Sequence, residues 1–375
     1  MRSRYLRIEA LSVIVSRTNG IHAHLPLRFA LRRCAGEVAT CDPLGGFPRK
    51  AAVATTGRRQ PFHCFTMVRI KENVSLAGHV AYKIGGRARY FFEARNIAAL
   101  KAALQKAHIL KLKVFVVGEG TNLLVHDKGF HGLVVKLSLM ELFRRATRIT
   151  AGAGVPMKKL VAFAAKHGLS GLEWAGGLPG TVGGAIRGNA GAFGGETKDS
   201  VSEVRSVDVK KLRERTHTRQ ECRFGYRSSI FKIRGGDEIV TSAVFQLKKG
   251  NPSAIQKATA EKIAYRKARH PLEFPNVGSI FKNVDVNDVP KHVFPGVAHV
   301  VKHDPFPVVP SAYLISEAGM KGVRVGGAEV SPKHPNFIVN RRNARAVDVK
   351  KLIARVQRAV KRKFGILLEP EVQIL

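Results

Sequence analysis

The stretch from Gly171 to Gly195, GLEWAGGLPGTVGGAIRGNAGAFGG, contains ten glycines among apolar residues. Disordered glycine-rich linkers instead carry serine, glutamine and charge. We therefore predict an ordered loop system that is anchored by Trp174, Leu178, Val182, Ile186 and Phe193. Glycine at this density lets backbone N–H groups approach a ligand that any Cβ would exclude, and it permits positive φ at turns. The segment thus predicts a site for a phosphate or a flat ring.

A second glycine loop lies upstream, in the sequence VFVVGEGTNLLV. Val114 to Val117 predicts a buried strand, Gly118 to Asn122 a tight turn, and Leu123 to Val125 a further apolar run. The turn lacks the third glycine and the following helix of the dinucleotide fingerprint. An ordinary hairpin turn and a pyrophosphate cradle both fit it, and the presence of two such loops favours the cradle.

The 375 residues are enough for two or three domains with a real hydrophobic core. No apolar run approaches the roughly 20 residues of a membrane-spanning helix, so we expect a soluble protein without membrane insertion. The four cysteines, Cys34, Cys41, Cys64 and Cys222, form no CxxC pair. This argues against a disulfide framework and a zinc site, and it favours a reducing cytoplasm.

A net charge of +37 and a pI near 10.7 are typical of nucleic-acid-binding proteins. The basic residues, however, are spread along the chain, and no helix-turn-helix, zinc finger or RNA-binding signature is present. We therefore interpret the charge as solvated surface and expect no nucleic-acid partner, with nucleic-acid binding as the alternative.

Residues 1–66 are rich in arginine, poor in acids and irregular in hydrophobic period. Their basic start is a poor secretory signal because Glu9 interrupts a short apolar run. A transit-like arm is one alternative. We expect instead that Met67 is the working start and that residues 1–66 are a disordered extension or are not translated.

From Met67 onward the pattern alternates between strands and helices, which predicts an α+β protein. The expected elements are a strand over Ala88 to Glu93, a helix over Asn96 to His108 capped by Asn96, a helix over Met157 to His167, short strands between Val204 and Leu247 interrupted by a basic turn over Arg213 to Arg219, a helix over Asn251 to Arg266, a helix over Ala312 to Ala318, a glycine turn over Gly322 to Gly327, and a last helix over Val347 to Phe364.

Three polar clusters place reactive groups beside turns: ECRFGYRSSIFK from Glu221, PNVGSIFKN from Pro275, and LEPEV from Leu368. Each cluster taken alone has a structural explanation, namely a surface ion pair, a serine that caps a turn, or a glutamate beside a proline.

In this order, after two glycine loops, the clusters closely resemble the UDP-N-acetylenolpyruvoylglucosamine reductase (MurB) family. The resemblance runs from about Glu72 to Val372 and includes KIGGRARYF, GEGTNLLV, GLEWAGGLPGTVGGAIRGNAGAFGGE, CRFGYRSSIF, VGSIFKN, LISEAGMKGVRVGGAEVSPKHPNFIVN and LEPEV. Residues 1–66 have no counterpart in it. The short stretch from Ser200 to Cys222 is similar to the compact subgroup that lacks a long tyrosine-bearing loop.

The resemblance implies an α+β fold with a two-lobed FAD-binding domain of the PCMH/vanillyl-alcohol-oxidase type and a C-terminal α+β substrate-binding domain. We expect FAD-binding subdomain 1 over residues 67–137, FAD-binding subdomain 2 over residues 138–250, and the C-terminal domain over residues 251–375. The implied activity is NADPH-dependent reduction of UDP-N-acetylglucosamine enolpyruvate to UDP-N-acetylmuramate through non-covalent FAD, in peptidoglycan precursor biosynthesis, by a monomer.

The resemblance also implies three catalytic residues. Arg227 would meet the charge that accumulates on the substrate carboxylate, because a guanidinium stays protonated and offers a fixed fork of donors. Glu371 would act with it in a protonated or proton-sharing state, since an ionised carboxylate would repel the intermediate. Ser279 would give a proton to C2 of the substrate, and Lys282 could supply part of the field that this step needs.

The implied ligand-binding residues follow from the same motifs. For FAD they are Gly118, Gly120, Thr121, Asn122, Leu123, Gly176, Gly177, Pro179, Gly180, Thr181, Gly183, Gly184, Asn189, Ala190 and Gly191, and for the UDP-sugar they are Tyr226, Arg269, Asn283 and Arg324. Gly188 stands where the family usually has methionine, so an apolar side chain is missing beside the flavin loop. The alternatives are another FAD-linked oxidoreductase of the same fold, a nucleic-acid-binding protein and an inactive flavoprotein.

Overall fold

The computed structural model describes residues 69–375 of the chain. The predicted extension, residues 1–66, lies outside the described residues, as do the predicted start at Met67 and the cysteines Cys34, Cys41 and Cys64. The remaining cysteine, Cys222, is a buried free thiol. All the described residues belong to one compact unit.

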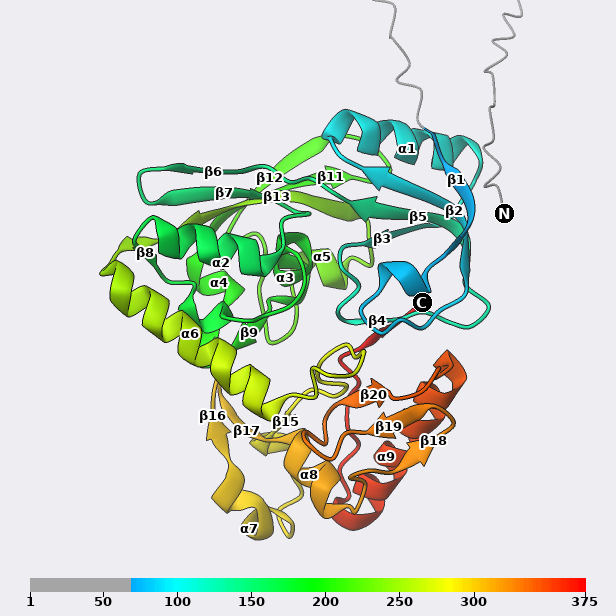
Figure 1. Cartoon of the computed structure of the whole chain (residues 1–375), viewed down its shortest axis with the longest axis vertical. Helices are drawn as coiled ribbons and strands as arrows, with labels where there is room; N and C mark the ends of the chain where they lie inside the picture. The colour runs from blue at the N-terminus through cyan, green and yellow to red at the C-terminus, as the bar shows by residue number, and fades with distance from the viewer. Residues whose placement is uncertain (1–68) are drawn as a thin grey trace, which may run out of the picture. The chain divides into compact units, whose positions relative to one another are not determined.

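The first sheet has four strands in the order β1-β2-β5-β3, and helix α1 covers one of its faces (Figure 1). Strand β5 runs parallel to both β2 and β3, so the chain crosses from β2 to β3 through α1. The buried residues of α1, Leu100, Ala103, Leu104 and Ala107, follow the helical period and face the sheet. The bounds are β1 (Lys71–Ser75), β2 (Arg87–Ala94), α1 (Ile97–Ile109), β3 (Val114–Val117) and β5 (Phe130–Leu137).

The second sheet is antiparallel, with five strands in the order β12-β11-β13-β7-β6. Val204 and Val207 of β11 and Phe245 of β13 are completely buried and pack in one core with Leu160 of helix α2. Figure 1 shows α2 and α3 on the face of this sheet opposite α1. The bounds are β6 (Leu142–Arg145), β7 (Arg148–Gly152), α2 (Met157–Lys166), α3 (Val182–Gly188), β11 (Val201–Asp208), β12 (Glu214–Thr218) and β13 (Glu238–Gln246).

The prediction of a basic turn over Arg213 to Arg219 is wrong, because most of that stretch forms strand β12. The turn comes just before it, where the Leu212 N–H donates to the Asp208 carbonyl at 2.9 Å and Leu212 adopts a φ of 55°. Strand β12 lies at the edge of the sheet and pairs only with β11. Edge strands often carry exposed charge, which here made a strand resemble a turn.

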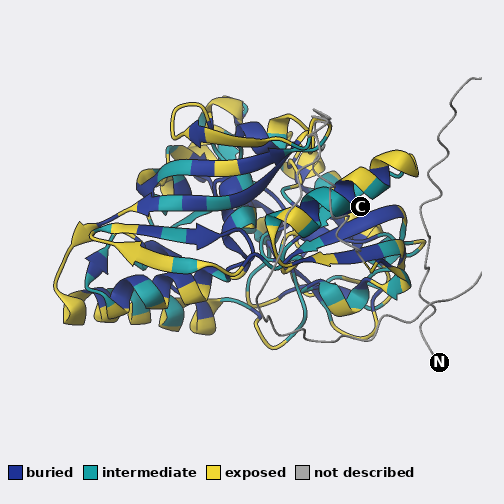
Figure 2. Ribbon diagram, turned by 90° about the horizontal axis from the view of Figure 1, so that it is seen from above, coloured by how far each residue is buried: buried dark blue, intermediate teal, exposed yellow. Residues whose placement is uncertain are grey.

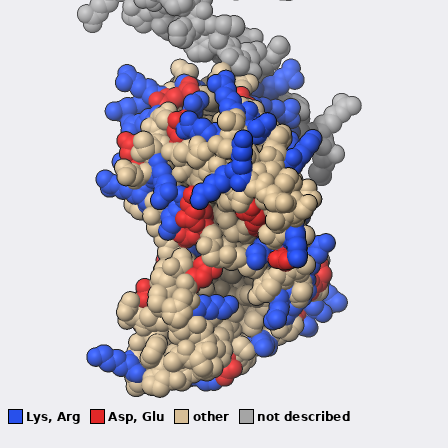
Figure 3. Space-filling model, turned by 90° about the vertical axis from the view of Figure 1, so that its left-hand side faces the viewer, with Lys and Arg blue, Asp and Glu red and all other residues tan. Residues whose placement is uncertain are grey.

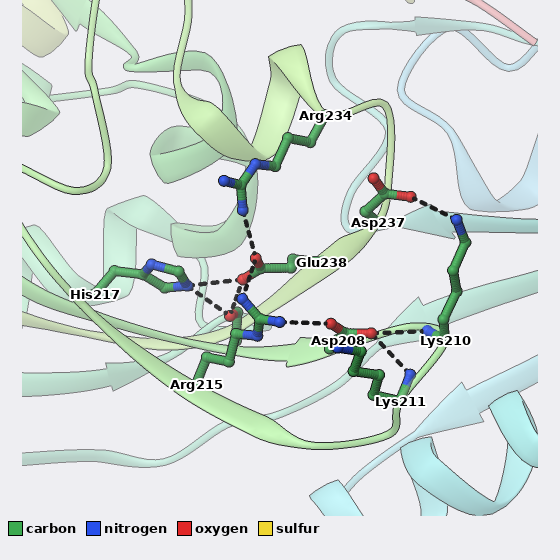
Figure 4. A network of polar contacts seen from close by, with 9 residues as sticks. Asp208, Lys210, Lys211, Arg215, His217, Arg234, Asp237 and Glu238 are labelled. Carbon is green, nitrogen blue, oxygen red and sulfur yellow. Dashed lines mark hydrogen bonds and ion pairs between the residues drawn. The ribbon is translucent and has the colours of Figure 1, made fainter.

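A buried carboxylate connects the second sheet to the short helix α5 (Ile230–Ile233). Glu238 begins β13, and its side chain accepts hydrogen bonds from Ser206 at 2.6 Å and Arg234 at 3.0 Å and contacts His217 at 2.7 Å. Figure 4 shows Arg234 and His217 converging on this carboxylate from different segments. Because Arg234 immediately follows α5, the network fixes the end of this helix against the sheet.

The predicted loop system between Gly171 and Gly195 contains a helix that the sequence analysis did not predict. Helix α3 begins after Thr181, whose side chain accepts a hydrogen bond from the Gly184 N–H at 3.5 Å, and it ends at Asn189 in the left-handed conformation. Val182, Ala185 and Ile186 bury its inner face. Burial thus overrides the low helix propensity of three glycines. The neighbouring elements are β8 (Leu169–Ser170), η2 (Glu173–Ala175), β9 (Gly191–Ala192), β10 (Gly195–Glu196) and α4 (Thr197–Ser200).

Helix α6 (Pro252–Arg269) leads into the C-terminal part, whose core centres on α9 (Ala346–Phe364). In α9, Val349, Leu352, Ile353, Val356 and Val360 form the buried stripe, and Gly365 ends the helix with a φ of 69°. The other elements are β14 (Lys248–Lys249), β15 (Val284–Asp285), η3 (Val286–Asp288), α7 (Phe294–Val297), η4 (Ala298–Val300), β16 (Lys302–His303), β17 (Pro307–Val309), α8 (Ser311–Glu317), β18 (Arg324–Val325), β19 (Ala328–Val330) and β20 (Ile338–Asn340).

The last residues of the chain return to the first glycine loop. Strand β21 (Gln373–Ile374) pairs in parallel with β4 (Leu123–Leu124), which directly follows the Gly118–Asn122 turn. Figure 1 shows this red C-terminal segment beside β4. The pairing brings Glu371 to the loop that was predicted to bind a pyrophosphate.

The structure confirms the expected α+β content, with helices within three residues of the predicted bounds at α1, α2, α6, α8 and α9. The Asn96 side chain caps α1 by accepting a hydrogen bond from the Ala99 N–H at 2.8 Å, as predicted. The predicted domain boundaries remain predictions. The core around α9 also includes Tyr82, Ile84 and Leu124, so the N-terminal part of the described chain contributes to it.

Buried and exposed residues occupy different parts of the structure. In Figure 2 buried residues fill the middle strands, while exposed residues mark the outer turns of the helices. On the face in Figure 3, Lys and Arg side chains are scattered among other residues. Within residues 69–375, no helix combines the length and apolar character needed to cross a membrane, and no group of three His, Cys, Asp or Glu is placed to hold a metal ion.

Candidate active site

A cavity of about 390 Å³ lies between the two glycine loops and the C-terminal segments around Ser279 and Glu371. Most of the predicted site residues line it. They are Gly118, Gly120, Thr121, Asn122, Leu123, Gly177, Pro179, Gly180, Thr181, Gly184, Ala190, Gly191, Arg227, Ser279 and Glu371.

The two glycine loops pack directly against each other. A Cβ on Gly118 would lie 2.5 Å from Thr181 Oγ1, and a Cβ on Gly180, whose φ is 103°, would lie 2.7 Å from Thr121 Oγ1. The Gly180 N–H also donates to the Glu119 carboxylate at 3.1 Å. Any side chain at these two glycines would push the loops apart, so glycine keeps two stretches of bare backbone together in the cavity wall.

Helix α3 presents a second bare surface to the cavity. Gly184 and Gly188 lie one helical turn apart, and both line the cavity. A Cβ on Gly188 would meet no atom within 4 Å, and one on Gly184 would meet only Thr181 Oγ1 at 3.8 Å. A planar ring can lie against such a strip, and a pyrophosphate can lie against the adjoining loops. The residues present therefore fit FAD.

Arg227 and Glu371 form the polar centre of the cavity. Arg227 Nε lies 3.2 Å from Glu371 Oε1, and Arg227 Nη2 donates to the Gly191 carbonyl at 2.9 Å. Arg227 has a φ of 52°, and its own carbonyl accepts a hydrogen bond from Lys232 Nζ at 2.8 Å. These contacts hold a non-glycine residue in the left-handed region, which is typical of functional sites.

Backbone hydrogen bonds fix the position of Glu371, and its surroundings shift the pKa of its carboxyl. Its N–H donates to the Ile280 carbonyl at 2.8 Å, and its carbonyl accepts a hydrogen bond from Asn122 Nδ2 at 3.1 Å. Burial raises the pKa of its carboxyl, although the positive charge of Arg227 opposes the shift. The carboxyl therefore binds a proton more readily than an exposed glutamate.

Ser279 lies in a tight turn next to the residue that holds Glu371. Gly278 adopts a φ of 79°, and its N–H donates to Asn276 Oδ1 at 3.0 Å. The following residue, Ile280, donates its N–H to the Asn336 carbonyl at 2.8 Å and accepts the bond from Glu371. The structure thus brings Arg227, Ser279 and Glu371 to one cavity, and their catalytic roles remain a prediction.

Three predicted FAD residues shape the loops without lining the cavity. The Gly176 carbonyl accepts a hydrogen bond from Arg266 Nε at 2.9 Å, and the Gly183 N–H donates to the Ala153 carbonyl at 2.9 Å. Asn189 is completely buried and donates its side-chain amide to the Gly225 carbonyl at 2.9 Å.

The four predicted UDP-sugar residues also lie outside the cavity lining. The Tyr226 hydroxyl accepts a hydrogen bond from the Asn283 N–H at 3.3 Å, and burial raises the pKa of Tyr226. Tyr226 directly precedes Arg227, which lines the cavity, and Asn283 lies four residues after Ser279. Arg269 is exposed and stacks over Tyr265, and Arg324 is paired with Glu329 at 2.8 Å in the sheet of β18 and β19.

Several cavity residues were not predicted from the sequence, among them Arg187, Lys232, Arg266 and His270. Burial lowers the pKa of each of the first three. A sequence signal existed for Arg266, because it lies eleven residues after the buried Ile255, which is about three helical turns and hence the same helix face.

Residues 88–211 match the family model of the FAD binding domain, and residues 270–375 match that of the UDP-N-acetylenolpyruvoylglucosamine reductase C-terminal domain. The fold and the glycine-lined cavity, together with these matches, define an FAD-dependent oxidoreductase.

Comparison with similar proteins identifies the family within this class of oxidoreductases. The chain is 37% identical over 313 residues to a UDP-N-acetylenolpyruvoylglucosamine reductase of Lachnoclostridium phytofermentans, covering 82% of this chain and 93% of that protein. It is 38% identical to one from Lactobacillus delbrueckii subsp. bulgaricus, covering 82% of this chain and 95% of that protein. The crystal structure of the MurB enzyme from Thermus caldophilus aligns with a TM-score of 0.65 at 31% identity, over 82% of this chain and 99% of that chain. The chain belongs to the UDP-N-acetylenolpyruvoylglucosamine reductase family.

Proposed function

We propose that the protein reduces UDP-N-acetylglucosamine enolpyruvate to UDP-N-acetylmuramate with electrons from NADPH, in peptidoglycan precursor synthesis in the cytoplasm. The observation that carries the proposal is the contact between Arg227 Nε and Glu371 Oε1, at 3.2 Å, in the same cavity as Ser279 and the glycine loops. The glycine loops would hold FAD, which when bound would supply the hydride chemistry between NADPH and C3 of the enolpyruvyl group.

Arg227 would bind the carboxylate of the substrate. Hydride addition at C3 places negative charge on C2 and on the attached carboxylate, and a guanidinium in a buried cavity stabilises that charge without a proton transfer. The hydrogen bonds from Arg227 to Gly191 and from Lys232 to Arg227 hold the guanidinium in place before the charge develops.

Glu371 would act as the protonated partner of the same carboxylate. An ionised glutamate would repel the developing charge, whereas a protonated one donates a hydrogen bond to it. The raised pKa of Glu371 supports this role. The orientation of the residue is fixed by its backbone bonds to Ile280 and Asn122.

Ser279 would deliver the proton that C2 receives. A serine hydroxyl is a weak acid, so the step needs a strong base close to Oγ and a positive local field. Lys232 lines the cavity and contributes to that field, and Lys282, three residues after Ser279, is paired with Glu369 at 2.5 Å.

The remaining site residues would bind the ligands. We assign FAD, held without a covalent bond, to the predicted glycine loops, with Gly176, Gly183 and Asn189 shaping them. Tyr226 and Asn283 would contact the UDP-sugar, together with Arg269 and Arg324 if these side chains turn toward bound substrate. We further propose that the enzyme is a monomer and binds no nucleic acid.

An absorbance spectrum of the purified protein tests the proposal. Flavin bands should bleach when NADPH is added without oxygen and should return when UDP-N-acetylglucosamine enolpyruvate follows. Bands that bleach but do not return would favour another FAD-linked oxidoreductase. A chain that binds no flavin would refute the proposal.

A further inference from the structure

Within residues 69–375, no carboxylate pairs with the side chain of Arg266, which is buried at the edge of the cavity. The residue is 8% exposed, belongs to α6 and lines the cavity. Its Nε donates to the Gly176 carbonyl at 2.9 Å. Its Nη2 is buried and has no hydrogen-bond partner among the described residues.

The surroundings of Arg266 are positive. Burial lowers the pKa of Arg266, and the nearby charge of Arg227 lowers it further. No carboxylate raises this pKa in compensation. Removing a charge from water without pairing it destabilises a fold. An anion that bound to the guanidinium would recover part of this free energy.

The charge balance of the cavity agrees with this interpretation. Its lining has four cationic side chains, Arg187, Arg227, Lys232 and Arg266, but only two carboxylates, Glu119 and Glu371. Glu119 accepts a hydrogen bond from Gly180, and Glu371 is paired with Arg227. Neither of these carboxylates is therefore available to neutralise Arg266.

His270 lies one helical turn after Arg266 and also lines the cavity. Burial, reinforced by the charges of His334 and Arg266, lowers the pKa of His270 to about 4. The imidazole is therefore neutral near pH 7 and offers a hydrogen bond without adding charge. Its ring packs against Phe337, at 5.0 Å between centroids, which fixes its position.

We infer that Arg266, assisted by His270, is an anion-binding subsite that takes a phosphate group of a nucleotide ligand. The inference rests on the proposed function, which supplies two nucleotides from solvent, the UDP-sugar and NADPH. A guanidinium matches the geometry of a phosphate with two parallel hydrogen bonds. In the proposed function Arg227 binds the substrate carboxylate, so its guanidinium is not available for the phosphate.

Calorimetric titration of the FAD-loaded protein with UDP, and separately with NADP⁺, tests the subsite. Arg266→Gln should weaken binding of one of them about tenfold or more, because a charge-assisted hydrogen bond is lost. The ligand affected identifies the source of the phosphate. Lys267→Gln removes the same charge from the next, exposed position of α6 and should change either affinity less than twofold.

Thermal unfolding separates anion binding from a structural role. If Arg266 served only to hold Gly176 and to pack over Phe193, 5.1 Å away, Arg266→Gln would lower the Tm of the ligand-free protein. An anion subsite predicts in addition a smaller rise in Tm on adding the nucleotide, whereas a purely structural role leaves that rise at its wild-type size. Arg266→Lys keeps the positive charge but loses the paired N–H donors of the guanidinium. This variant should therefore retain part of the nucleotide-induced rise in Tm.

Two results would overturn the inference. Equal nucleotide affinities for Arg266→Gln and wild type would refute the subsite while leaving the proposed function intact. A wild-type protein that binds FAD but neither UDP nor NADP⁺ would refute both together.

Discussion

At the scale of single residues, the cavity depends on groups that their neighbours hold in uncommon states. Arg227 keeps a left-handed backbone because Gly191, Lys232 and Glu371 all contact it. The three catalytic candidates could be predicted from the sequence because each stands in a short motif. For Arg266 the helical spacing from Ile255 indicates only the buried face of α6, and its place in the cavity could not be predicted, since it depends on how α6 packs against the glycine-rich segment.

Ser279→Ala should separate the two half-reactions of the proposed enzyme. Reduction of the flavin by NADPH needs no proton from Ser279 and should stay nearly unchanged. Reoxidation by the enolpyruvyl substrate should slow by about 100-fold or more, the usual contribution of a positioned general acid. Stopped-flow absorbance measures both rates. Ser253→Ala, at an exposed position of α6, is the control, and equal loss in both half-reactions would contradict the proton-donor role.

Glu371→Gln should change how stability depends on pH. Because burial raises the pKa of Glu371 in the folded state, the folded protein binds this proton more tightly than the unfolded chain does. The folding free energy linked to this proton is fully present below the ordinary carboxyl pKa. It is lost as pH rises through the raised pKa that Glu371 has in the folded protein. The free energy of unfolding of the variant should therefore improve relative to wild type as pH increases. Urea unfolding between pH 5 and pH 8 measures this, and a constant difference would refute a raised pKa.

At the scale of elements, short helices position the site. The network around Glu238 fixes Arg234 after α5 (Figure 4). Helix α5 carries Lys232, which donates a hydrogen bond to the Arg227 carbonyl. Periodicity predicted the long helices α1 and α9, because their buried stripes are visible in the sequence. It could not predict α3, whose three glycines argue against a helix and whose stability comes from Val182, Ala185 and Ile186 packing below the sheet.

Gly118→Ala should weaken FAD binding by separating the two glycine loops. The new Cβ would lie 2.5 Å from Thr181 Oγ1, so one loop must move. We expect a loss of about tenfold or more in FAD affinity, measured by flavin fluorescence on titration, since such a clash costs about 1 to 3 kcal/mol. In Gly296→Ala, the added Cβ meets no atom within 4 Å, and FAD affinity should not change. Equal affinities for both variants would show that the loops do not form the FAD site.

At the scale of the whole molecule, the resemblance predicted the order of the two parts but not how the chain joins them. The C-terminal core recruits Tyr82, Ile84 and Leu124 from the first part, and the Tyr82 hydroxyl donates to the Ile338 carbonyl at 2.7 Å. These contacts join residues about 250 positions apart, and local sequence patterns carry no information on such pairings. The basic residues likewise do not gather on one helix or strand of the face in Figure 3, where Lys and Arg are scattered among other residues.

The pairing of β21 with β4 joins the end of the chain to the first glycine loop, so removal of residues 373–375 should affect both stability and cofactor binding. Three backbone hydrogen bonds would be lost: Gln373 N–H to Asn122, Leu375 N–H to Leu124, and His126 N–H to Leu375, at 3.1, 3.0 and 2.7 Å. At about 1 kcal/mol each, their loss should lower the free energy of unfolding by about 3 kcal/mol.

The same deletion should weaken FAD binding, because Asn122 belongs to the cavity wall and loses its partner on the last strand. Its side chain would still donate to the Glu371 carbonyl, so the site should loosen without being abolished. Denaturant unfolding and FAD titration of the truncated protein measure the two effects. If stability fell while FAD affinity stayed at the wild-type value, the C-terminal strand would support the fold alone, and the position of Glu371 would have to be fixed by its bond to Ile280 rather than by the pairing of β21 with β4.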